Sequence, residues 1–317
     1  MILYRNMKYI LGHKNPDTDT VCSALVYSDF LKQKGDNCQA FALGELNNET
    51  KFVFNKFRVG EIEKIDKLPQ GSEIVLLDHN ESGQSIENIN DLDIVEIIDH
   101  HKIKLETDKP IKIYIEPLGS SCSIIAKKYF ENKDVILTKQ NASLLLAGII
   151  SDTLYFRSPT TTSVDKELAQ KLNEIAEIED LEEFSLEMFK AKSDLGNIDV
   201  EKLIKLDYKE FYFNDKKYTI GVMETTNPEY GFNRRDEIKQ KLSEIKEKDS
   251  LAGIFFSIID ILNSKNYTLT SDEENDLIIK NAFQAEETNG FLLINNVVSR
   301  KKQIVPKLQE YFKNIKE

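Results

Sequence analysis

Short apolar runs alternate with longer amphipathic stretches through the first half of the chain. The runs are rich in β-branched residues and predict β-strands at residues 9–11, 74–77, 94–98 and 111–115. Apolar residues at helical spacing predict helices over 20–34, 123–130, 139–150 and 166–175. Strands that alternate with helices of this length are typical of a parallel α/β sheet covered by helices on both faces. We therefore expect an α/β fold in this part of the chain.

The pattern changes after a short polar segment, residues 192–197, which contains a glycine and has little apolar periodicity. Beyond it the predicted strands are longer and fewer. They are expected at 218–223, 251–261 and 291–298, with helices at 235–248 and 306–315. The chain is therefore predicted to form a larger N-terminal domain with a parallel sheet (1–191), a linker (192–197) and a smaller C-terminal α/β domain with a mixed sheet (198–317).

Length and composition agree with two folded domains. The chain has 317 residues, of which 40% are apolar and 30% are charged, and a globular chain of this size is expected to divide into two cores. The formal net charge is −12, whereas nonspecific binding to nucleic acid relies on many Lys and Arg contacts with phosphates. We therefore expect no nucleic-acid partner.

The three cysteines, Cys22, Cys38 and Cys122, are far apart and form no CxxC motif. An odd number of separated cysteines favours a reducing compartment. The N-terminal sequence has no apolar stretch followed by a small-residue cleavage site, and no apolar run reaches transmembrane length. The sequence therefore predicts a cytoplasmic protein without a membrane partner.

All four histidines lie in the first third of the chain, and each stands in a short acidic motif. His13 belongs to GHKNPDTD, His79 to DHN, and His100 and His101 to DHH. Each motif follows a predicted strand. A further apolar run, 144–150, leads into Ser-Asp-Thr, and we count its end with the strand ends although it also fits one of the predicted helices. Because ligands converge outside the carboxyl ends of parallel strands, we expect these side chains to meet.

The candidate metal ligands are four carboxylates and two imidazoles, namely His13, Asp17, Asp19, Asp78, His100 and Asp152. One divalent ion needs fewer protein ligands, so the set predicts a two-metal centre of the phosphoryl-transfer type. Oxygen and nitrogen ligands without thiolate favour Mn²⁺, with Fe²⁺, Co²⁺ and Zn²⁺ as rivals. His79 and Asp99 are expected to orient a ligand by hydrogen bonding. The alternative explanation, helix caps and core histidines, does not account for every histidine following one pattern.

A cluster of positive charge lies near the C-terminus, where Arg300, Lys301 and Lys302 follow an apolar run. Such triplets are commonly solvated surface. In a protein with a dinuclear metal centre, however, they would bind the far end of an anionic substrate, Arg as a planar fork and Lys as a point charge. Lys209, at the start of the second domain, is a further candidate.

Taken in order, these motifs resemble those of the family II inorganic pyrophosphatases, the manganese-dependent branch of the DHH phosphoesterase superfamily. The resemblance rests on GHKNPDTD, DHNE, DHH, SDT and SRKKQ and covers essentially the whole chain. It implies two α/β domains with the active site in the cleft between them. It further implies that His13 and Asp17 hold one Mn²⁺, that Asp19, His100 and Asp152 hold the other, and that Asp78 bridges them. The residues expected to contact pyrophosphate are His101, Lys209, Arg300 and Lys301.

The activity that the resemblance implies is hydrolysis of inorganic pyrophosphate to two phosphates. A hydroxide bridging the two Mn²⁺ ions of a subunit would attack the substrate, which arrives with Mg²⁺, and Co²⁺ is the alternative metal. The resemblance also implies a homodimer through the larger domain. The alternative function is that of another DHH phosphoesterase, a hydrolase of oligonucleotides or polyphosphate. Nucleic-acid-directed relatives usually carry a GGGH element in the second domain, and this chain has no histidine after His101.

Overall fold

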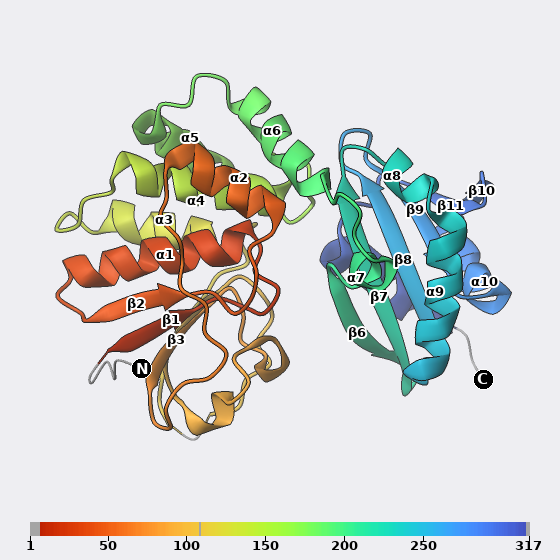
Figure 1. The fold of residues 1–317 in the computed structure, drawn as a ribbon, viewed down its shortest axis with the longest axis horizontal. Helices are drawn as coiled ribbons and strands as arrows, with labels where there is room; N and C mark the ends of the chain where they lie inside the picture. Colours follow the sequence, from red (N-terminus) through yellow and green to blue (C-terminus); the bar gives the residue numbers. More distant parts are fainter. Residues whose placement is uncertain (1–6, 108, 315–317) are drawn as a thin grey trace. The chain divides into compact units, whose positions relative to one another are not determined.

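The computed structural model describes residues 7–107 and 109–314. The chain divides into two compact units, Met1–Ala191 and Lys192–Glu317 (Figure 1). The segment expected to be a linker, 192–197, begins within a helix, because Lys192 and Ser193 are the last residues of α6 (Leu181–Ser193). Residues 194–199 are irregular, so the non-helical connection starts two residues later than the sequence predicts.

A parallel sheet forms the centre of the first unit, as the sequence pattern predicts. Within the described residues it has five strands in the order β2-β1-β3-β4-β5, and every neighbouring pair is parallel. The strands are β1 (Lys8–Leu11), β2 (Cys38–Phe41), β3 (Glu73–Leu77), β4 (Asp93–Asp99) and β5 (Lys112–Ile115). Strand β2 is missing from the sequence-based prediction, because its four residues, CQAF, include no β-branched residue and are interrupted by a glutamine.

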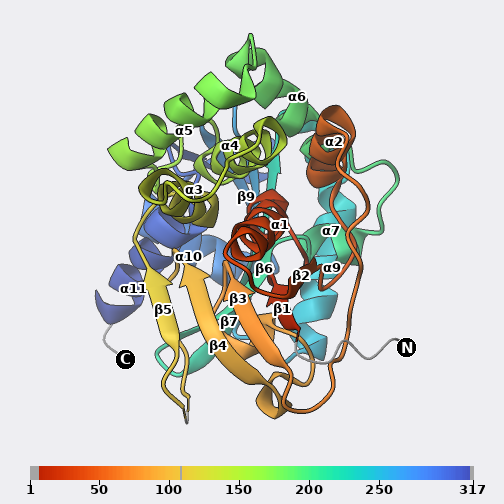
Figure 2. The ribbon, with the colours of Figure 1, turned by 90° about the vertical axis from the view of Figure 1, so that its left-hand side faces the viewer.

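The α-helices of the first unit gather on one face of this sheet (Figures 1 and 2). They are α1 (Thr18–Gln33), α2 (Asn48–Phe57), α3 (Ser121–Glu131), α4 (Lys139–Thr153), α5 (Ser163–Ala176) and α6. The opposite face packs against loops and two short 3₁₀ helices, η1 (Ser82–Gln84) and η2 (Ile89–Asp91), through side chains such as Leu68 and Ile86. The expectation of helices on both faces is therefore wrong, because the segment between α2 and β4 buries isolated apolar residues and not a helical stripe.

The apolar run 144–150 belongs to α4 and not to a strand. Every residue from 142 to 151 is buried, so this part of α4 packs around its whole circumference. A helix that is buried on all sides lacks the one-sided apolar pattern of an amphipathic helix and appears in the sequence as a continuous apolar run. Periodicity alone cannot tell such a run from a buried strand. Asp152 therefore lies in the last turn of a helix, and the expectation that it follows a strand is wrong.

The second unit is built on a mixed sheet, as expected. In its described residues the sheet has six strands in the order β10-β11-β9-β8-β7-β6, with β7 and β8 parallel and the other neighbouring pairs antiparallel. The strands are β6 (Tyr208–Phe213), β7 (Lys216–Thr225), β8 (Gly253–Asp260), β9 (Lys265–Thr270), β10 (Glu286–Thr288) and β11 (Phe291–Asn295). The expectation of few strands is wrong, because Lys209 and Glu210 interrupt the aromatic residues of β6, and β9, KNYTLT, is mostly polar.

Helices and one π-helix complete the second unit. They are α7 (Val200–Ile204), α8 (Glu229–Phe232), α9 (Arg235–Lys248), α10 (Glu273–Phe283), the π-helix η3 (Arg300–Ile304) and α11 (Val305–Asn314). The helix predicted at 235–248 is α9. The helix predicted at 306–315 corresponds to α11, although residue 315 lies outside the described residues. Among the described helices, none has the length and apolar character needed to cross a membrane.

Candidate metal centre

The first motif that carries ligands spans the loop between β1 and α1 and the first turn of α1, which contains Asp19. Asp17 is the N-cap of α1, and its Oδ1 accepts a hydrogen bond from the Thr20 backbone N–H over 2.9 Å. Its other oxygen, Oδ2, lies 3.4 Å from His13 Nε2. Gly12 is required in this turn, because a Cβ there would come within 2.6 Å of the Thr20 side chain. Capping therefore fixes Asp17 and still leaves Oδ2 available to a cation.

Asp78 follows β3 and faces two histidines. Its backbone φ is +63°, in the left-handed region that Asp and Asn adopt more readily than most residues. Asp78 Oδ2 lies 3.4 Å from His13 Nε2, and Asp78 Oδ1 lies 3.4 Å from His100 Nε2. The carboxylate thus presents one oxygen to each histidine, as a ligand shared by two metal ions would do.

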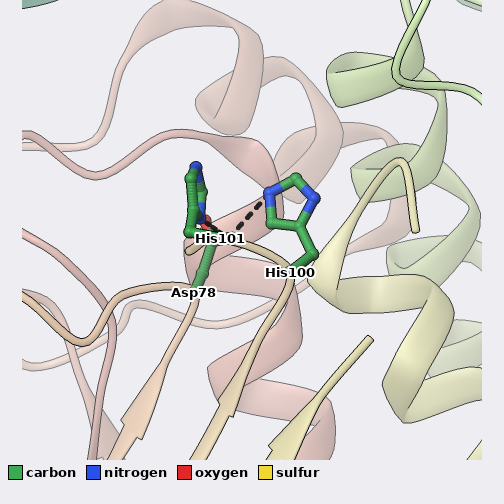
Figure 3. A group of neighbouring side chains, drawn as sticks. All are labelled: Asp78, His100 and His101. Atoms are coloured by element: carbon green, nitrogen blue, oxygen red, sulfur yellow. Dashed lines mark ion pairs between the residues drawn. The ribbon is translucent and has the colours of Figure 1, made fainter. Parts of the chain in front are cut away.

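His100 and Asp152 form a second group with Asp19. His100 follows β4, and its Nε2 lies 3.5 Å from Asp152 Oδ2. One ligand atom from each of Asp19, His100 and Asp152 lies within 4.8 Å of the others, and the same holds for His13, Asp17 and Asp78. The fold therefore brings together all six side chains that the sequence analysis predicts as metal ligands. Figure 3 shows Asp78 and His100 at the ends of adjacent strands, joined by an ion pair.

Both of these histidines are oriented as metal ligands need to be. His13 Nδ1 lies 2.7 Å from the carbonyl oxygen of Lys14, and His100 Nδ1 lies 2.9 Å from the carbonyl oxygen of Leu118. A carbonyl oxygen only accepts, so Nδ1 carries the proton in each ring. In the neutral ring, the form that binds a metal, the lone pair therefore lies on Nε2, the atom that faces the carboxylates.

The donor set fits two divalent cations. Metal bonds of about 2.0–2.2 Å to nitrogen and oxygen place neighbouring ligand atoms roughly 3.0–3.5 Å apart. The separations around His13 Nε2 and His100 Nε2 are 3.4–3.5 Å. The four carboxylates in the two groups carry four negative charges when ionised, which two divalent ions balance. Oxygen and imidazole ligands without thiolate suit Mn²⁺.

The pKa values of the cluster reflect this concentration of charge. Burial and the negative charge of Asp78 raise the pKa of Asp19 to about 7. Burial also acts to raise the pKa of Asp78, but His13 and His100 outweigh it and hold that pKa far below its usual range. Burial acts to lower the pKa of His13, but Asp17 and Asp78 outweigh it and raise that pKa well above its usual value. Bound cations would relieve the repulsion between the acids.

His101 and Asp99 form a pair beside the cluster. Asp99 Oδ1 accepts hydrogen bonds from the His101 backbone N–H over 3.0 Å and from ring Nδ1 over 2.9 Å. Asp99 therefore orients the His101 ring, whose Nδ1 lies 3.8 Å from Asp78 Oδ1. The Nδ1 of His79 donates to the Leu77 carbonyl over 2.9 Å, as the Nδ1 atoms of His13 and His100 do to theirs, but burial lowers the pKa of His79 to about 4. His79 is therefore a neutral, buried ring.

The N-terminus of α3, which is absent from the predicted site, binds Asp19. Asp19 Oδ1 accepts hydrogen bonds from Ser120 Oγ over 2.6 Å and from the Cys122 backbone N–H over 2.9 Å. Asp19 Oδ2 accepts from the Ser121 backbone N–H over 2.7 Å. The sequence signal for this helix start is the segment GSSCS before an apolar stretch. That signal reveals the cap but not the carboxylate that it binds.

The predicted phosphate-binding residues Lys209, Arg300 and Lys301 lie in the second unit, Lys209 on β6 and the other two in η3. Arg300 Nη2 donates to Asp207 Oδ1 over 2.6 Å, and Nη1 donates to the Asp207 carbonyl over 2.8 Å. The Arg300 side chain is only 11% exposed. Its guanidinium is therefore held in one position by Asp207, a residue that the sequence analysis did not identify.

Gln303 holds the loop that leads into η3. Its Oε1 accepts hydrogen bonds from the backbone N–H groups of Val298 and Ser299 over 2.9 and 3.0 Å. Its Nε2 donates to the Asn296 carbonyl over 2.7 Å. These bonds fix the backbone directly before Arg300. The π-helix that follows is of a kind frequently found at functional sites.

Replacing Gly148 by Ala is expected to destabilise the metal-free protein and to weaken metal binding. Gly148 lies inside α4, where a Cβ would overlap Cys122 Sγ and lie 3.0 Å from Asp19 Oδ1. Such overpacking lowers the free energy of unfolding by about 1–3 kcal/mol. The better helix propensity of Ala raises it by at most about 1 kcal/mol. We expect a net loss of roughly 1 kcal/mol in the free energy of unfolding, measured by urea denaturation. Gly83→Ala is the control, since nothing lies within 4 Å of its Cβ position. Unchanged stability of Gly148→Ala would contradict the close approach.

Comparisons with known proteins match both units. Residues 8–149 match the DHH family, N-terminal domain, and residues 186–311 match the DHHA2 domain.

Curated relatives match over almost the whole chain. A probable manganese-dependent inorganic pyrophosphatase from Deinococcus radiodurans is 41% identical over 311 residues, which cover 96% of this chain and 99% of the relative. A manganese-dependent inorganic pyrophosphatase from Methanocaldococcus jannaschii is 40% identical over 313 residues, with coverage of 96% and 99%. One from Bacillus subtilis is 39% identical over 303 residues, with coverage of 95% and 97%.

Solved structures agree with these matches. A Methanococcus jannaschii protein, described as a candidate family II inorganic pyrophosphatase, has a TM-score of 0.84 and 40% identity, and the match covers 97% of this chain and 100% of that one. An exopolyphosphatase-related protein from Bacteroides fragilis has a TM-score of 0.51 and 15% identity, with coverage of 97% and 93%. The second likeness shows a shared fold alone.

Proposed function

Because the chain belongs to the manganese-dependent, family II inorganic pyrophosphatases of the DHH family, we infer that this protein hydrolyses inorganic pyrophosphate to two phosphates. Relatives about 40% identical over nearly the full length support this activity. The structural observation that carries it is Asp78, whose two oxygens lie 3.4 Å from His13 Nε2 and 3.4 Å from His100 Nε2. A carboxylate shared in this way suits two-metal phosphoryl transfer.

Each subunit is proposed to hold two Mn²⁺ ions, with Co²⁺ as the alternative metal. His13 and Asp17 would bind one ion, Asp19, His100 and Asp152 would bind the other, and Asp78 would bridge them. The two groups of adjacent ligand atoms support this assignment. When bound, the ions supply the acidity that turns water into a nucleophile near neutral pH.

The protein side chains would bind and orient the substrate. Arg300, Lys209 and Lys301 are proposed to neutralise the phosphate groups, together with Mg²⁺ that arrives with the substrate. The fixed guanidinium of Arg300 supports this role, because a pre-organised fork loses little freedom when it binds phosphate. His101 is proposed to contact the substrate or to donate a proton. Since its Nδ1 is engaged with Asp99, Nε2 is the ring atom that can hydrogen-bond the substrate.

The function is tested by phosphate release from pyrophosphate. Metal-stripped protein is reconstituted with Mn²⁺, with Co²⁺, or with Mg²⁺ alone, and each sample is also incubated with an oligonucleotide. We expect rapid phosphate release only when the transition metal is present, because the imidazole ligands suit Mn²⁺ better than Mg²⁺. Cleavage of the oligonucleotide without phosphate release from pyrophosphate would contradict the proposal and favour another DHH phosphoesterase.

We also propose a cytoplasmic homodimer that forms through the first unit. The three free cysteines support the location, since a reducing compartment keeps thiols unpaired. Strand β5 supports the dimer, because it is the terminal strand of the described sheet and carries exposed apolar side chains, Ile113 at 47% and Tyr114 at 42%. Exposed apolar edge strands tend to pair with another chain, and a second copy is the usual partner in a soluble oligomer.

Replacing Ile113 by Lys is expected to convert the dimer into a monomer. A charged side chain on an edge strand opposes strand pairing because its charge must be buried in the new interface. The measurement is molar mass by light scattering after gel filtration. Ile136→Lys is the matched control, since Ile136 is 74% exposed and lies outside β5. A dimer that survives Ile113→Lys, or a monomeric native protein, would contradict this interface.

A further inference from the structure

Two hydroxyl groups hold the shared carboxylate of Asp78. Thr20 Oγ1 donates to Asp78 Oδ2 over 3.0 Å, and Ser121 Oγ donates to Asp78 Oδ1 over 2.8 Å. Asp78 is 2% exposed, Thr20 is 1% exposed and Ser121 is 0% exposed. Hydrogen bonds from hydroxyl to carboxylate are charge-assisted and strong in such buried surroundings. Each oxygen of Asp78 therefore has its own fixed donor.

These donors divide between the two groups of ligands. Asp78 Oδ2, which accepts from Thr20, is the oxygen near His13. Asp78 Oδ1, which accepts from Ser121, is the oxygen near His100. One hydroxyl therefore acts on the His13 side of the carboxylate, and the other acts on the His100 side.

Both hydroxyls are held in place by their surroundings. The methyl group of Thr20 fits over Gly12, where a Cβ would approach it to 2.6 Å. The backbone N–H of Ser121 donates to Asp19 Oδ2 over 2.7 Å. The loop before Ser121 is anchored by Asp165, whose Oδ2 accepts from the Gly119 backbone N–H over 2.9 Å. Both hydroxyl groups are therefore already fixed before a cation binds, as in a pre-organised site.

We propose that Thr20 and Ser121 are positioning residues, each of which orients one oxygen of Asp78 toward one of the two metal ions. Thr20 serves the ion at His13 and Asp17, and Ser121 serves the ion at Asp19, His100 and Asp152. This inference rests on the proposed two-metal function. A hydroxyl that occupies one lone pair of a carboxylate oxygen restricts the rotation of the group, so the other lone pair stays directed at the cation.

The experiment measures Mn²⁺ binding to metal-stripped protein, with free Mn²⁺ followed by electron paramagnetic resonance. Thr20→Val and Ser121→Ala each remove one hydroxyl. We expect each variant to lose about 10- to 100-fold in affinity at one of the two metal positions, as is typical when a residue that supports a ligand is lost. The other position should change by less than about threefold, because its own donor remains.

Two ligand variants assign the affected position. Asp17→Asn weakens Mn²⁺ binding at the metal position beside His13. The higher Mn²⁺ affinity measured in this variant then belongs to the metal position beside His100. In that background Ser121→Ala should lower the Mn²⁺ affinity and Thr20→Val should not. In an Asp152→Asn background the order should reverse. Equal losses from both hydroxyl variants in both backgrounds, or no loss from either, would overturn the inference.

Three further variants separate positioning from folding. Thr20→Ser and Ser121→Thr keep a hydroxyl and should keep Mn²⁺ affinity within about threefold of the native protein. Ser23→Ala is the matched control, since Ser23 is buried in α1 and its hydroxyl donates to the Thr20 carbonyl over 3.1 Å, not to a carboxylate. A loss in Thr20→Ser as large as in Thr20→Val would show that packing, and not the hydroxyl, supports the site, and would overturn the inference.

Failure of the inference differs from failure of the proposed function. Native protein that binds fewer than two Mn²⁺ per subunit, or that releases no phosphate from pyrophosphate, would contradict the function. Native protein that binds two ions and hydrolyses pyrophosphate, with hydroxyl variants of unchanged affinity, would contradict the inference alone.

Discussion

Asp78→Asn is expected to reduce pyrophosphate hydrolysis by at least about 1000-fold and to weaken both metal positions. Residues that only support a ligand contribute about 10–100-fold, and loss of a ligand shared by two ions should exceed that range. Asn has nearly the shape of Asp, but its amide nitrogen is a donor and cannot bind a cation. Asn also tolerates the φ of +63° at this position. The backbone should therefore stay in place while the bridge is lost.

The measurement combines phosphate release with Mn²⁺ binding to the metal-stripped variant. Asp93→Asn is the control, because Asp93 lies at the start of β4, pairs with Lys109 at the surface and carries no proposed ligand role. It should retain native activity and two bound ions. Activity of Asp78→Asn within tenfold of the native protein, or two ions still bound with native affinity, would show that Asp78 is not a bridging ligand.

Arg300→Ala is expected to lower kcat/KM for pyrophosphate by about 1000-fold while leaving Mn²⁺ binding unchanged. Arginines that stabilise a phosphoryl group in its transition state contribute about 10³–10⁵ in rate, and we expect the lower end because Lys209 and Lys301 would remain. Arg300→Lys should recover only part of the loss, since an ammonium group keeps the charge but lacks the planar fork. Steady-state kinetics of both variants test this expectation.

Lys302 provides the matched control for Arg300. It is the exposed third cation of the same triplet and has no proposed contact with substrate. Lys302→Ala should lower kcat/KM by less than about fivefold, because only a general electrostatic attraction of the anionic substrate is lost. Because Arg300 also bonds Asp207, thermal unfolding of each variant shows whether the second unit stays folded. An equal loss in Lys302→Ala would indicate a diffuse positive field and not a specific guanidinium contact.

The metal cluster could be predicted because its signals are local. Strands β1, β3 and β4 appear in the sequence as apolar runs, and each is followed within a few residues by Asp or His. Parallel strands deliver whatever follows them to one edge of the sheet. The position of His13, Asp78 and His100 in one cluster follows from that rule without knowledge of the tertiary structure.

Other features could not be predicted because they depend on contacts between distant segments. Asp152 was expected after a strand, but α4 is buried on all sides and has no amphipathic pattern. Strands β6 and β9 gain their partners from the sheet, and charged or polar residues interrupt the apolar pattern of both. The second face of the parallel sheet is covered by isolated apolar residues in loops, which have no periodicity to detect.

The sequence by itself therefore determined the type of chemistry, namely the carboxylates, the imidazoles, their order along the chain and the parallel strands that gather them. Only the tertiary structure decided the geometry. It assigned one oxygen of Asp78 to each histidine, and it brought Ser121 to Asp78 from 43 residues away and Ser120 to Asp19 from 101 residues away. The physical reason is that a residue's ligand chemistry is a property of the residue and its neighbours, whereas hydrogen bonds across such distances exist only after separate helices and strands pack together.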